Sequence, residues 1–289
     1  MVSGGFVGRS HISAFRQKQE TPALFGASAH PMIIAYAQRA SIAALVFGFV
    51  AASASAQTGS IKGKIVLDGA APKLAPVVVK GDSAAKDAAV CATVEVPNEG
   101  LVTDGVNVAN VVVYLNSPTA KNPALEAEIL KKSKEIEVDQ TKCVFVPHVS
   151  VMHSKQTLVF KSSDSVNHNV RYSAFTNPPF NQILASNAKT ASLKLVPERR
   201  PLPLACDIHP WMKGYLMVFN HPFFVVTGAD GTFEIKGIPA GSHKVVAWQE
   251  SAGYVTTGAA AGQAVEVKAD EATDLGEIKV PVAKLKIQK

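Results

Sequence analysis

The chain of 289 residues is poor in charge and lacks the motifs of most enzymes. Only 18% of its residues are charged. The first 56 residues hold four basic and one acidic side chain, so residues 57–289 carry 25 basic and 22 acidic ones, a net charge of +3. That balance is too mild to indicate a nucleic-acid partner. No Ser-His-Asp order, HExxH motif or Gly-rich phosphate loop occurs, which argues against a hydrolase or a nucleotide-dependent enzyme.

Long apolar runs are also missing. The most apolar stretch, residues 43–52, is shorter than the roughly 20 residues that a membrane-spanning helix needs. It lies in a segment that begins at Met32, follows Arg39 and precedes small residues ending at Ala56, a pattern typical of a secretory signal peptide. We therefore expect residues 1–56 to be a signal region, with the start at Met32 and cleavage after Ala56. The mature protein would be periplasmic or secreted and would have no membrane span.

Cysteine is scarce, with three in the chain. An odd number in an exported protein leaves at least one thiol unpaired. Cys206 lies among other metal-binding side chains, whereas Cys91 and Cys143 lie in ordinary strand-like or loop surroundings. We therefore predict a disulfide between Cys91 and Cys143, which would close a loop of about fifty residues and stabilise the fold by about 4 kcal/mol.

What the sequence does contain is a succession of short, Val-rich, alternating segments, such as "SIKGKIVLDG" and "HKVVAWQE", separated by Gly, Pro, Asn and Asp. This pattern is typical of an all-β sandwich or barrel. One helix is expected at 123–134, with Asn122 as its N-cap and Pro123 as its first residue.

Near His221 the sequence pattern changes to tight hairpins with turns such as "TGADGT" and "KGIPAGSH", which indicates a domain boundary. We expect a first domain at 57–220 and a second at 221–289. Residues 57–140 belong either to the first sandwich or to a separate small domain.

The stretch "CDIHPWM" places Cys206, His209 and Met212 on one short loop. Thiolate, imidazole and thioether are soft or borderline ligands that select copper over the hard cations. Two His and one Cys in a plane, with a distant Met, make up the blue-copper arrangement, so one His is missing from the loop. The upstream stretch "SSDSVNHNV" supplies His168 at a strand end. The predicted ligands of one copper ion are therefore His168, Cys206, His209 and Met212.

Neighbouring residues support this interpretation. Pro210 fixes a backbone dihedral and lacks an N–H, which stiffens the loop. Asn169 is placed to hydrogen-bond across to the Cys206 loop and so to orient the ligands. The alternatives are a buried free thiol beside an unrelated turn histidine, or a zinc site, although structural zinc sites normally use more Cys and no Met. His148 and His153 are candidates for a second metal site, but alternation places them on opposite faces and favours ordinary sandwich residues.

With a loop of the form Cys-x2-His-Pro-x-Met and a first histidine followed by Asn, residues 145–220 resemble the cupredoxins, most closely the amicyanin and plastocyanin type. The resemblance implies a Greek-key β-sandwich with a type 1 copper ion that transfers single electrons and is not an enzyme. It also implies that the edge of His209 reaches the surface in an apolar patch where a redox partner docks, such as a c-type cytochrome or a dehydrogenase. The patch candidates near Trp211 are Pro178, Pro179, Phe180, Pro210 and Trp211. The chain departs from the family in having about 90 residues between the cleavage site and the matched region.

The segment "FFVVTGADGTFEIKGIPAGSHKVVAWQE" resembles a carboxypeptidase regulatory-like domain, a small transthyretin-like or prealbumin-like β-sandwich that has no catalytic residues. This fold is shared with carbohydrate-binding modules, so a glycan ligand is an analogy only. Two other functions therefore stand beside electron transfer. One is a cell-surface or periplasmic binding protein with a carbohydrate-binding-like C-terminal module, and the other is copper storage or delivery.

We expect the exported protein to begin at Gln57, because the small residues before it form the cleavage site. Intact-mass spectrometry and N-terminal sequencing of the protein recovered from an exporting host measure this directly. A mature protein that retains residues 43–52 would contradict the prediction and indicate a membrane anchor instead.

Overall fold

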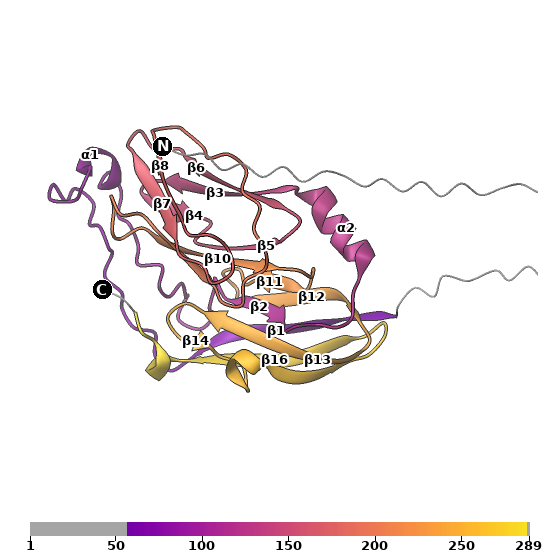
Figure 1. Ribbon diagram of the computed structural model, residues 1–289. Helices are drawn as coiled ribbons and strands as arrows, with labels where there is room; N and C mark the ends of the chain where they lie inside the picture. The colour runs from indigo at the N-terminus through magenta and orange to yellow at the C-terminus, as the bar shows by residue number, and fades with distance from the viewer. Residues whose placement is uncertain (1–56, 288–289) are drawn as a thin grey trace, which may run out of the picture. The chain divides into compact units, whose positions relative to one another are not determined.

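The structure is a computed structural model that describes residues 57–287. The predicted signal region, with its start at Met32 and its cleavage site at Ala56, lies outside the described residues. Within residues 57–287 no helix is both long and apolar enough to cross a membrane. Figure 1 shows that strands make up most of the regular structure, so the all-β prediction is confirmed.

The strands, in chain order, are β1 (Thr58–Asp68), β2 (Val112–Leu115), β3 (Glu135–Thr141), β4 (Val144–Val146), β5 (Val149–His153), β6 (Thr157–Ser162), β7 (His168–Tyr172), β8 (Phe180–Leu184), β9 (Leu202–Ala205), β10 (Lys213–Phe219), β11 (Phe224–Val226), β12 (Thr232–Pro239), β13 (Gly241–Gln249), β14 (Gly253–Tyr254), β15 (Gln263–Val267) and β16 (Ala272–Pro281). The α-helices are α1 (Ala88–Cys91) and α2 (Pro123–Lys132), and short 3-10 helices lie at Ala259–Ala261 and Val282–Lys284. Helix α2 ends two residues before the predicted end. Its predicted N-cap is present, because the Asn122 side chain accepts a hydrogen bond of 3.0 Å from the N–H of Leu125.

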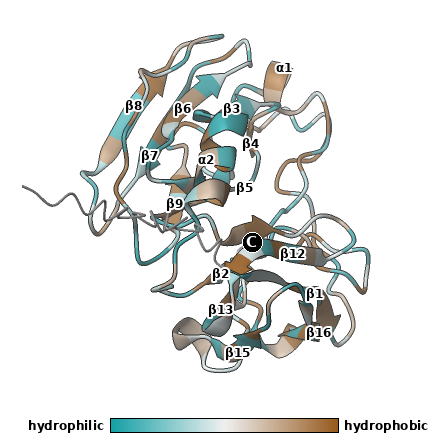
Figure 2. Cartoon of the chain, turned by 90° about the vertical axis from the view of Figure 1, so that its right-hand side faces the viewer, coloured by the Kyte–Doolittle hydropathy of each residue, from teal (hydrophilic) through white to brown (hydrophobic). Residues whose placement is uncertain are grey.

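The first sandwich consists of the sheet β5-β10-β9-β7-β8 and the smaller sheet β4-β3-β6. Side chains from both sheets form one buried cluster, which includes Val138, Phe145, Phe160, Val170 and Leu216. Burying such a side chain contributes about 1.5–3 kcal/mol, so this cluster is the main force that holds the two sheets together. In Figure 2 strands β3 to β9 gather in one group, above the group that contains β1, β2, β12 and β13.

The second sandwich takes strands from both ends of the described chain. β1 pairs antiparallel with β12 and parallel with β16. β2 pairs with β11 and β13. Their buried side chains share one core, which includes Ile61, Ile65, Val113, Phe223 and Ile278.

Strand pairing therefore does not follow the boundary predicted at residue 220. β1 and β2 lie within the predicted first domain, 57–220, yet they complete the sandwich formed by the predicted second domain, 221–289. The first sandwich is an insertion between β2 and β11. The physical reason is that alternation identifies a strand but not its partner, and the partners of β1 lie far along the chain.

The segment between β1 and β2 crosses from the second sandwich to the first. It has little regular structure apart from α1, whose last residue, Cys91, forms a disulfide with Cys143. The two Cα atoms are 5.3 Å apart, and the bond closes a loop of 52 residues. This is the pairing expected from the sequence. It holds α1 against the first sandwich.

The two sandwiches meet through apolar and charged contacts. Val112 and Trp248 of the second sandwich share a buried cluster with Val149 and Phe219 of the first. Close by, His148 Nε2 lies 3.0 Å from a Glu250 oxygen and His148 Nδ1 lies 3.4 Å from a Glu99 oxygen. Burial alone would lower the pKa of His148, but the hydrogen bond to Glu250 and the nearby Glu99 carboxylate raise it to about 9. The imidazolium therefore ties the sandwiches together.

We expect a fragment of residues 221–289 to remain unfolded, because it lacks β1 and β2 and with them the buried Ile61, Ile65 and Val113. The measurement is the amide dispersion of a two-dimensional NMR spectrum, with residues 57–289 as the folded control. A well-dispersed spectrum of the fragment would show that the last domain folds alone and that β1 and β2 are dispensable.

Candidate metal centre

Strand pairing brings the predicted ligands together. His168 is the first residue of β7, and Cys206 directly follows β9. Arg171 of β7 pairs with Ala205 of β9, which brings Cys206 close to the start of β7, where His168 lies. His209 lies in the loop after β9, and Met212 directly precedes β10. The structure thus places residues from separate segments in one buried site at the end of the first sandwich.

Three potential ligand atoms converge there. His168 Nδ1 lies 2.9 Å from His209 Nδ1, and Cys206 Sγ lies 4.0 Å from the first and 3.8 Å from the second. The point equidistant from these three atoms is about 2.1 Å from each, which matches metal–nitrogen and metal–thiolate bonds of about 2.0–2.3 Å. The triangle therefore has the size that a single transition-metal ion requires.

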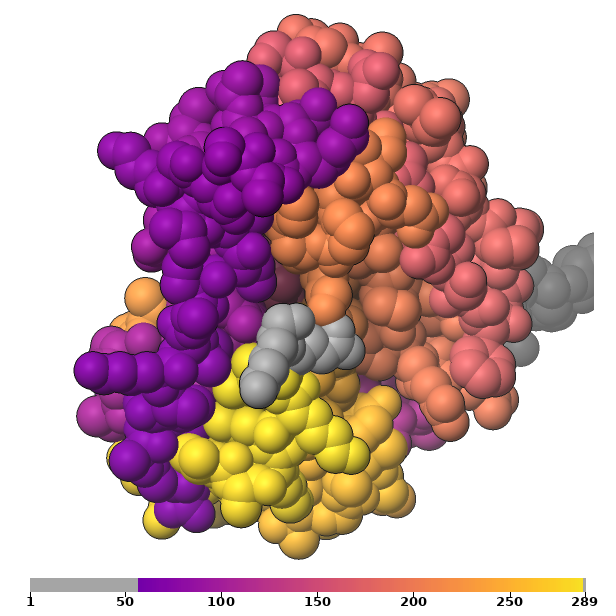
Figure 3. Space-filling model, turned by 90° about the vertical axis from the view of Figure 1, so that its left-hand side faces the viewer, coloured from indigo at the N-terminus to yellow at the C-terminus, as the bar shows by residue number. Residues whose placement is uncertain are grey.

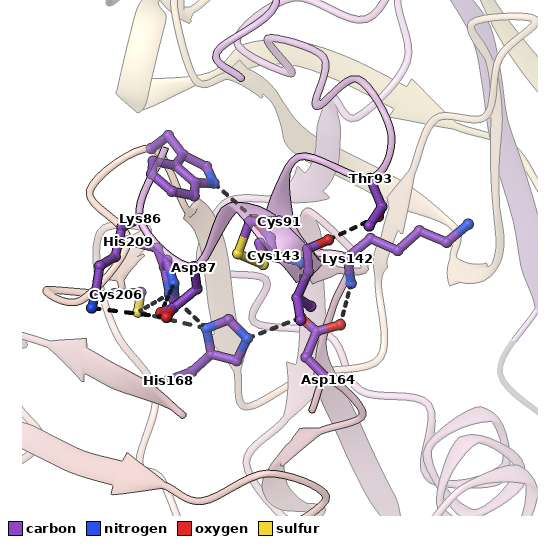
Figure 4. The surroundings of a disulfide bond; sticks show 12 residues. Lys86, Asp87, Cys91, Thr93, Lys142, Cys143, Asp164, His168, Cys206 and His209 are labelled. Carbon is purple, nitrogen blue, oxygen red and sulfur yellow. Dashed lines mark hydrogen bonds and ion pairs between the residues drawn. A yellow bond between two sulfur atoms is a disulfide. The ribbon is translucent and has the colours of Figure 1, made fainter. Parts of the chain in front are cut away.

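The outer nitrogen of each imidazole faces a carboxylate. His168 Nε2 lies 2.9 Å from Asp164 Oδ2, and His209 Nε2 lies 2.9 Å from Asp87 Oδ2. A carboxylate only accepts hydrogen bonds, so each Nε2 carries the hydrogen and each Nδ1 turns a lone pair inward. Carboxylate–histidine pairs of this kind orient histidine ligands in metal sites. Figure 4 shows this arrangement next to the disulfide.

Converging lone pairs need a cation. Without one, the two Nδ1 atoms would repel each other across 2.9 Å in a site where both histidines are 0% exposed. In the metal-free protein a proton fills this role: burial would lower the pKa of His168, but its bonds to Asp164 and Cys206 raise it to about 9. Burial would raise the pKa of Cys206, but bonds to His168, His209 and the Asn169 N–H lower it to about 6. The site therefore favours a thiolate and a positive charge beside it.

Asn169 links the two ligand segments. Its backbone N–H donates to Cys206 Sγ at 3.4 Å, and its side-chain oxygen accepts from the N–H groups of Asp207 at 2.6 Å and Ile208 at 3.3 Å. The loop is closed on itself, because the N–H of Cys206 bonds to Met212 O and the N–H of Met212 bonds to His209 O. Asn169 thus lies where the sequence placed it, across from the Cys206 loop.

Met212 and Pro210 lie on opposite sides of the loop, one buried and one exposed. Met212 is 1% exposed and belongs to the same buried cluster as Cys206. Pro210 is exposed and precedes Trp211, whose indole N–H donates to Cys143 O at 3.1 Å. The loop therefore has an apolar inner side and an outer side tied to the disulfide region.

The environment of His209 differs from what the cupredoxin resemblance implies. His209 is 0% exposed, because Asp87 covers its outer nitrogen. Pro178 and Pro179 are exposed, while Phe180 stacks on Phe160 and Tyr172 in the first sandwich. The edge of His209 therefore does not reach the surface.

Two residues of the site were not found from the sequence. Asp164 lies four residues before His168 in "SSDSVNHNV", close enough in the chain that it could have been proposed as the carboxylate partner of the ligand histidine. Asp164 also accepts backbone N–H groups of Lys142 at 2.6 Å and Cys143 at 2.8 Å, which fixes it in place. Asp87 had no such signal, because it is more than a hundred residues from His209 and only the fold brings it there.

His148 and His153 do not form a second metal site with each other. His148 contacts Glu99 and Glu250, and His153 Nε2 lies 3.4 Å from a Glu126 oxygen. Among the described residues, the candidate metal groups all include His168 or His209. One thiolate and two imidazoles form a donor set that suits copper, with zinc as the rival, and does not suit magnesium or calcium.

No protein-family model matches the chain, and no curated protein matches it. Among solved structures, parts of the chain are similar to a copper-containing nitrite reductase from Thermus scotoductus SA-01, at 22% identity over 29% of this chain and 22% of that one, with a TM-score of 0.27. A purple cupredoxin from Nitrosopumilus maritimus matches at 18% identity over 29% of this chain and 98% of that one, with a TM-score of 0.25. A reduced mutant of amicyanin matches at 17% identity over 30% and 83%, with a TM-score of 0.27. TM-scores this low establish no common fold, so the function proposed below stands on the geometry of the site.

Asp164→Asn and Asp87→Asn should each weaken metal binding by about 10- to 100-fold, the usual effect of removing a carboxylate that orients a ligand histidine. The affinity for zinc, measured by competition with a chromophoric chelator, reports this without any redox chemistry. Asp82→Asn is the matched control, because Asp82 lies in the same segment as Asp87 and its exposed side chain accepts a hydrogen bond from the N–H of Ala84, away from the ligands. Unchanged affinity in both site variants would show that the carboxylates do not orient the ligands.

Proposed function

We propose that the protein is an exported electron carrier that holds one type 1 copper ion through His168, Cys206 and His209, with Met212 as a weak fourth ligand. The observation that carries this proposal is the convergence of two imidazole lone pairs and one thiolate at 2.9, 3.8 and 4.0 Å in a fully buried site. When bound, copper would supply a one-electron couple, which no side chain of the site has by itself.

The surrounding residues favour electron transfer over substrate chemistry. His168, Cys206, His209 and Met212 are at most 2% exposed, so no ligand position faces an opening where a substrate could coordinate. Catalytic metal sites keep such a position open. The burial supports a carrier and argues against an enzyme.

The protein also holds the site rigidly, as a carrier requires. β7 and β9 are paired, Asn169 bonds to the backbone of the Cys206 loop, and Asp164 and Asp87 fix both imidazoles. A geometry that is held in advance limits rearrangement when the charge of the site changes by one. This rigidity also argues against copper storage or delivery, which needs ready exchange.

The partners follow from the same proposal. Electrons would pass to or from a redox protein, such as a c-type cytochrome or a dehydrogenase, in a weak and transient encounter. The second sandwich would act as a structural or docking module, with a glycan ligand as the alternative.

Cys206→Ser should abolish the intense thiolate-to-copper band in the visible spectrum of the Cu(II)-loaded protein, because the sulfur that produces it is gone. Met212→Leu should keep the band and shift the reduction potential, since the weak axial ligand tunes that potential. Visible spectroscopy, electron paramagnetic resonance and voltammetry measure both.

Met152→Leu is the matched control for Met212→Leu. Met152 is a fully buried methionine of the same core that lies outside the copper loop, so its replacement should leave both band and potential unchanged. A wild-type protein that binds Cu(II) without an intense visible band would overturn the type 1 assignment.

A further inference from the structure

A cavity of about 790 Å³ opens beside the copper loop, where the two sandwiches meet. Its walls come from the segment between β1 and β2, from the loop before β10 and the start of β10, and from the residues that follow β13. Val144, His148, Lys286 and Ile287 complete the lining. Figure 3 shows a hollow on this face, between the indigo chain and the orange chain. Its volume lies in the range of about 300–1,000 Å³ that is typical of small-molecule sites, which also favour domain junctions.

Trp211 connects this cavity to the metal centre. Its indole lines the cavity, and the centre of its ring is 5.2 Å from that of His209. The bond from its N–H to Cys143 O holds the ring in this position. Since Asp87 covers the outer nitrogen of His209, Trp211 provides a route from solvent-accessible space to a ligand ring.

The lining is suited to a flat ring with a hydroxyl group. Trp211 and Tyr215 offer aromatic surfaces, and four prolines offer flat apolar ones: Pro72, Pro76, Pro97 and Pro210. Both Glu250 and Glu99 lie against His148, at 3.0 and 3.4 Å, but the Glu250 side chain is only 8% exposed, whereas the Glu99 side chain is 27% exposed and keeps a free side toward the cavity. Glu99 therefore presents a carboxylate that accepts a hydrogen bond from a ligand. The raised pKa of Tyr215, about 12 through burial and the charge of Glu250, keeps its phenol protonated, while Lys73, Lys213 and Lys286 add positive charge to the lining.

We propose that this cavity binds a small phenol or hydroquinone, with its ring against Trp211 and its hydroxyl donating to Glu99, and that electrons enter the copper centre there. The second part of this inference rests on the proposed function. In the step, the O–H bond of the phenol breaks, its proton passes to a Glu99 oxygen and then to water, and one electron leaves the ring through Trp211 and His209. A copper ion held by His168, Cys206 and His209 would supply the one-electron oxidant that accepts it. The product is a phenoxyl radical, so charge and electrons balance.

Binding is tested first on the metal-free protein, which separates it from the copper chemistry. Hydroquinone is titrated without oxygen into ¹⁵N-labelled protein, and the indole N–H signals of the two tryptophans, Trp211 and Trp248, are followed. We expect a saturable shift of the Trp211 signal. Cyclohexane-1,4-diol, which lacks the aromatic ring, and benzoate, which lacks the hydroxyl, should cause no saturable shift over the same range.

Two variants localise the effect. Ala75→Phe adds a ring to an exposed residue that lines the cavity and should abolish the saturable shift, because the new side chain occupies the site. Ala71→Phe adds the same ring to an exposed residue nearby that does not line it, and should bind hydroquinone as the wild type does. Absence of a saturable shift in the wild type, or equal shifts in both variants, would overturn the proposal. If benzoate binds as well as hydroquinone, the ligand is an aromatic acid and not a phenol, and the assignment of the ligand is overturned.

Electron entry is tested on the Cu(II)-loaded protein by stopped-flow bleaching of the visible band. The rate should saturate with hydroquinone in the wild type and in Ala71→Phe, and should be slower and linear in Ala75→Phe. Equal rates in all three proteins would overturn the entry route. A protein without the band would refute the proposed function, while the titration of the metal-free protein still decides whether the cavity binds a phenol.

Discussion

The convergence of His168 Nδ1, His209 Nδ1 and Cys206 Sγ in the buried interior is the constraint on which the rest of the structure depends. Two lone pairs and a thiolate buried within 4.0 Å of one another are stable only around a cation, either a proton or a metal ion, because they otherwise repel one another where water cannot screen them. Paired strands, a closed loop and two carboxylates hold them in place.

The arrangement of the two sandwiches serves that site. The first sandwich is inserted between β2 and β11 of the second, so the segment that leaves β1 must return across the first sandwich before it reaches β2. On the way it delivers Asp87 to His209 and Cys91 to the disulfide with Cys143. The same crossing covers the histidine edge that the cupredoxin resemblance places at the surface, and it forms one wall of the cavity beside Trp211. The segment between β1 and β2 therefore both covers the edge of His209 and helps to form the cavity beside Trp211.

Local patterns predicted the parts of the molecule that depend on neighbouring residues. Alternating apolar residues identified the strands, and Asn122 with Pro123 identified the start of α2. Cysteine arithmetic identified the pair Cys91 and Cys143, and the loop from Cys206 to Met212 with the distant His168 identified the residues that the fold brings together. Strand pairing across the predicted domain boundary was not foreseen, because β1 looks like any other strand and nothing near it in the sequence reveals that its partners are β12 and β16.

The sequence by itself determined the chemistry of the donors, since a thiol, two imidazoles and a thioether are properties of residue types and of one short loop. It also determined that the chain is all-β, because alternation with a period of two is a local property. Only the tertiary structure decided the charge and access of the site. Asp87 and Asp164 turn the histidine lone pairs inward, and burial of His209 moves the contact with the outside to Trp211. These features depend on which segments meet in space. Pairing between distant strands decides this, and the residues adjacent in the chain do not reveal it.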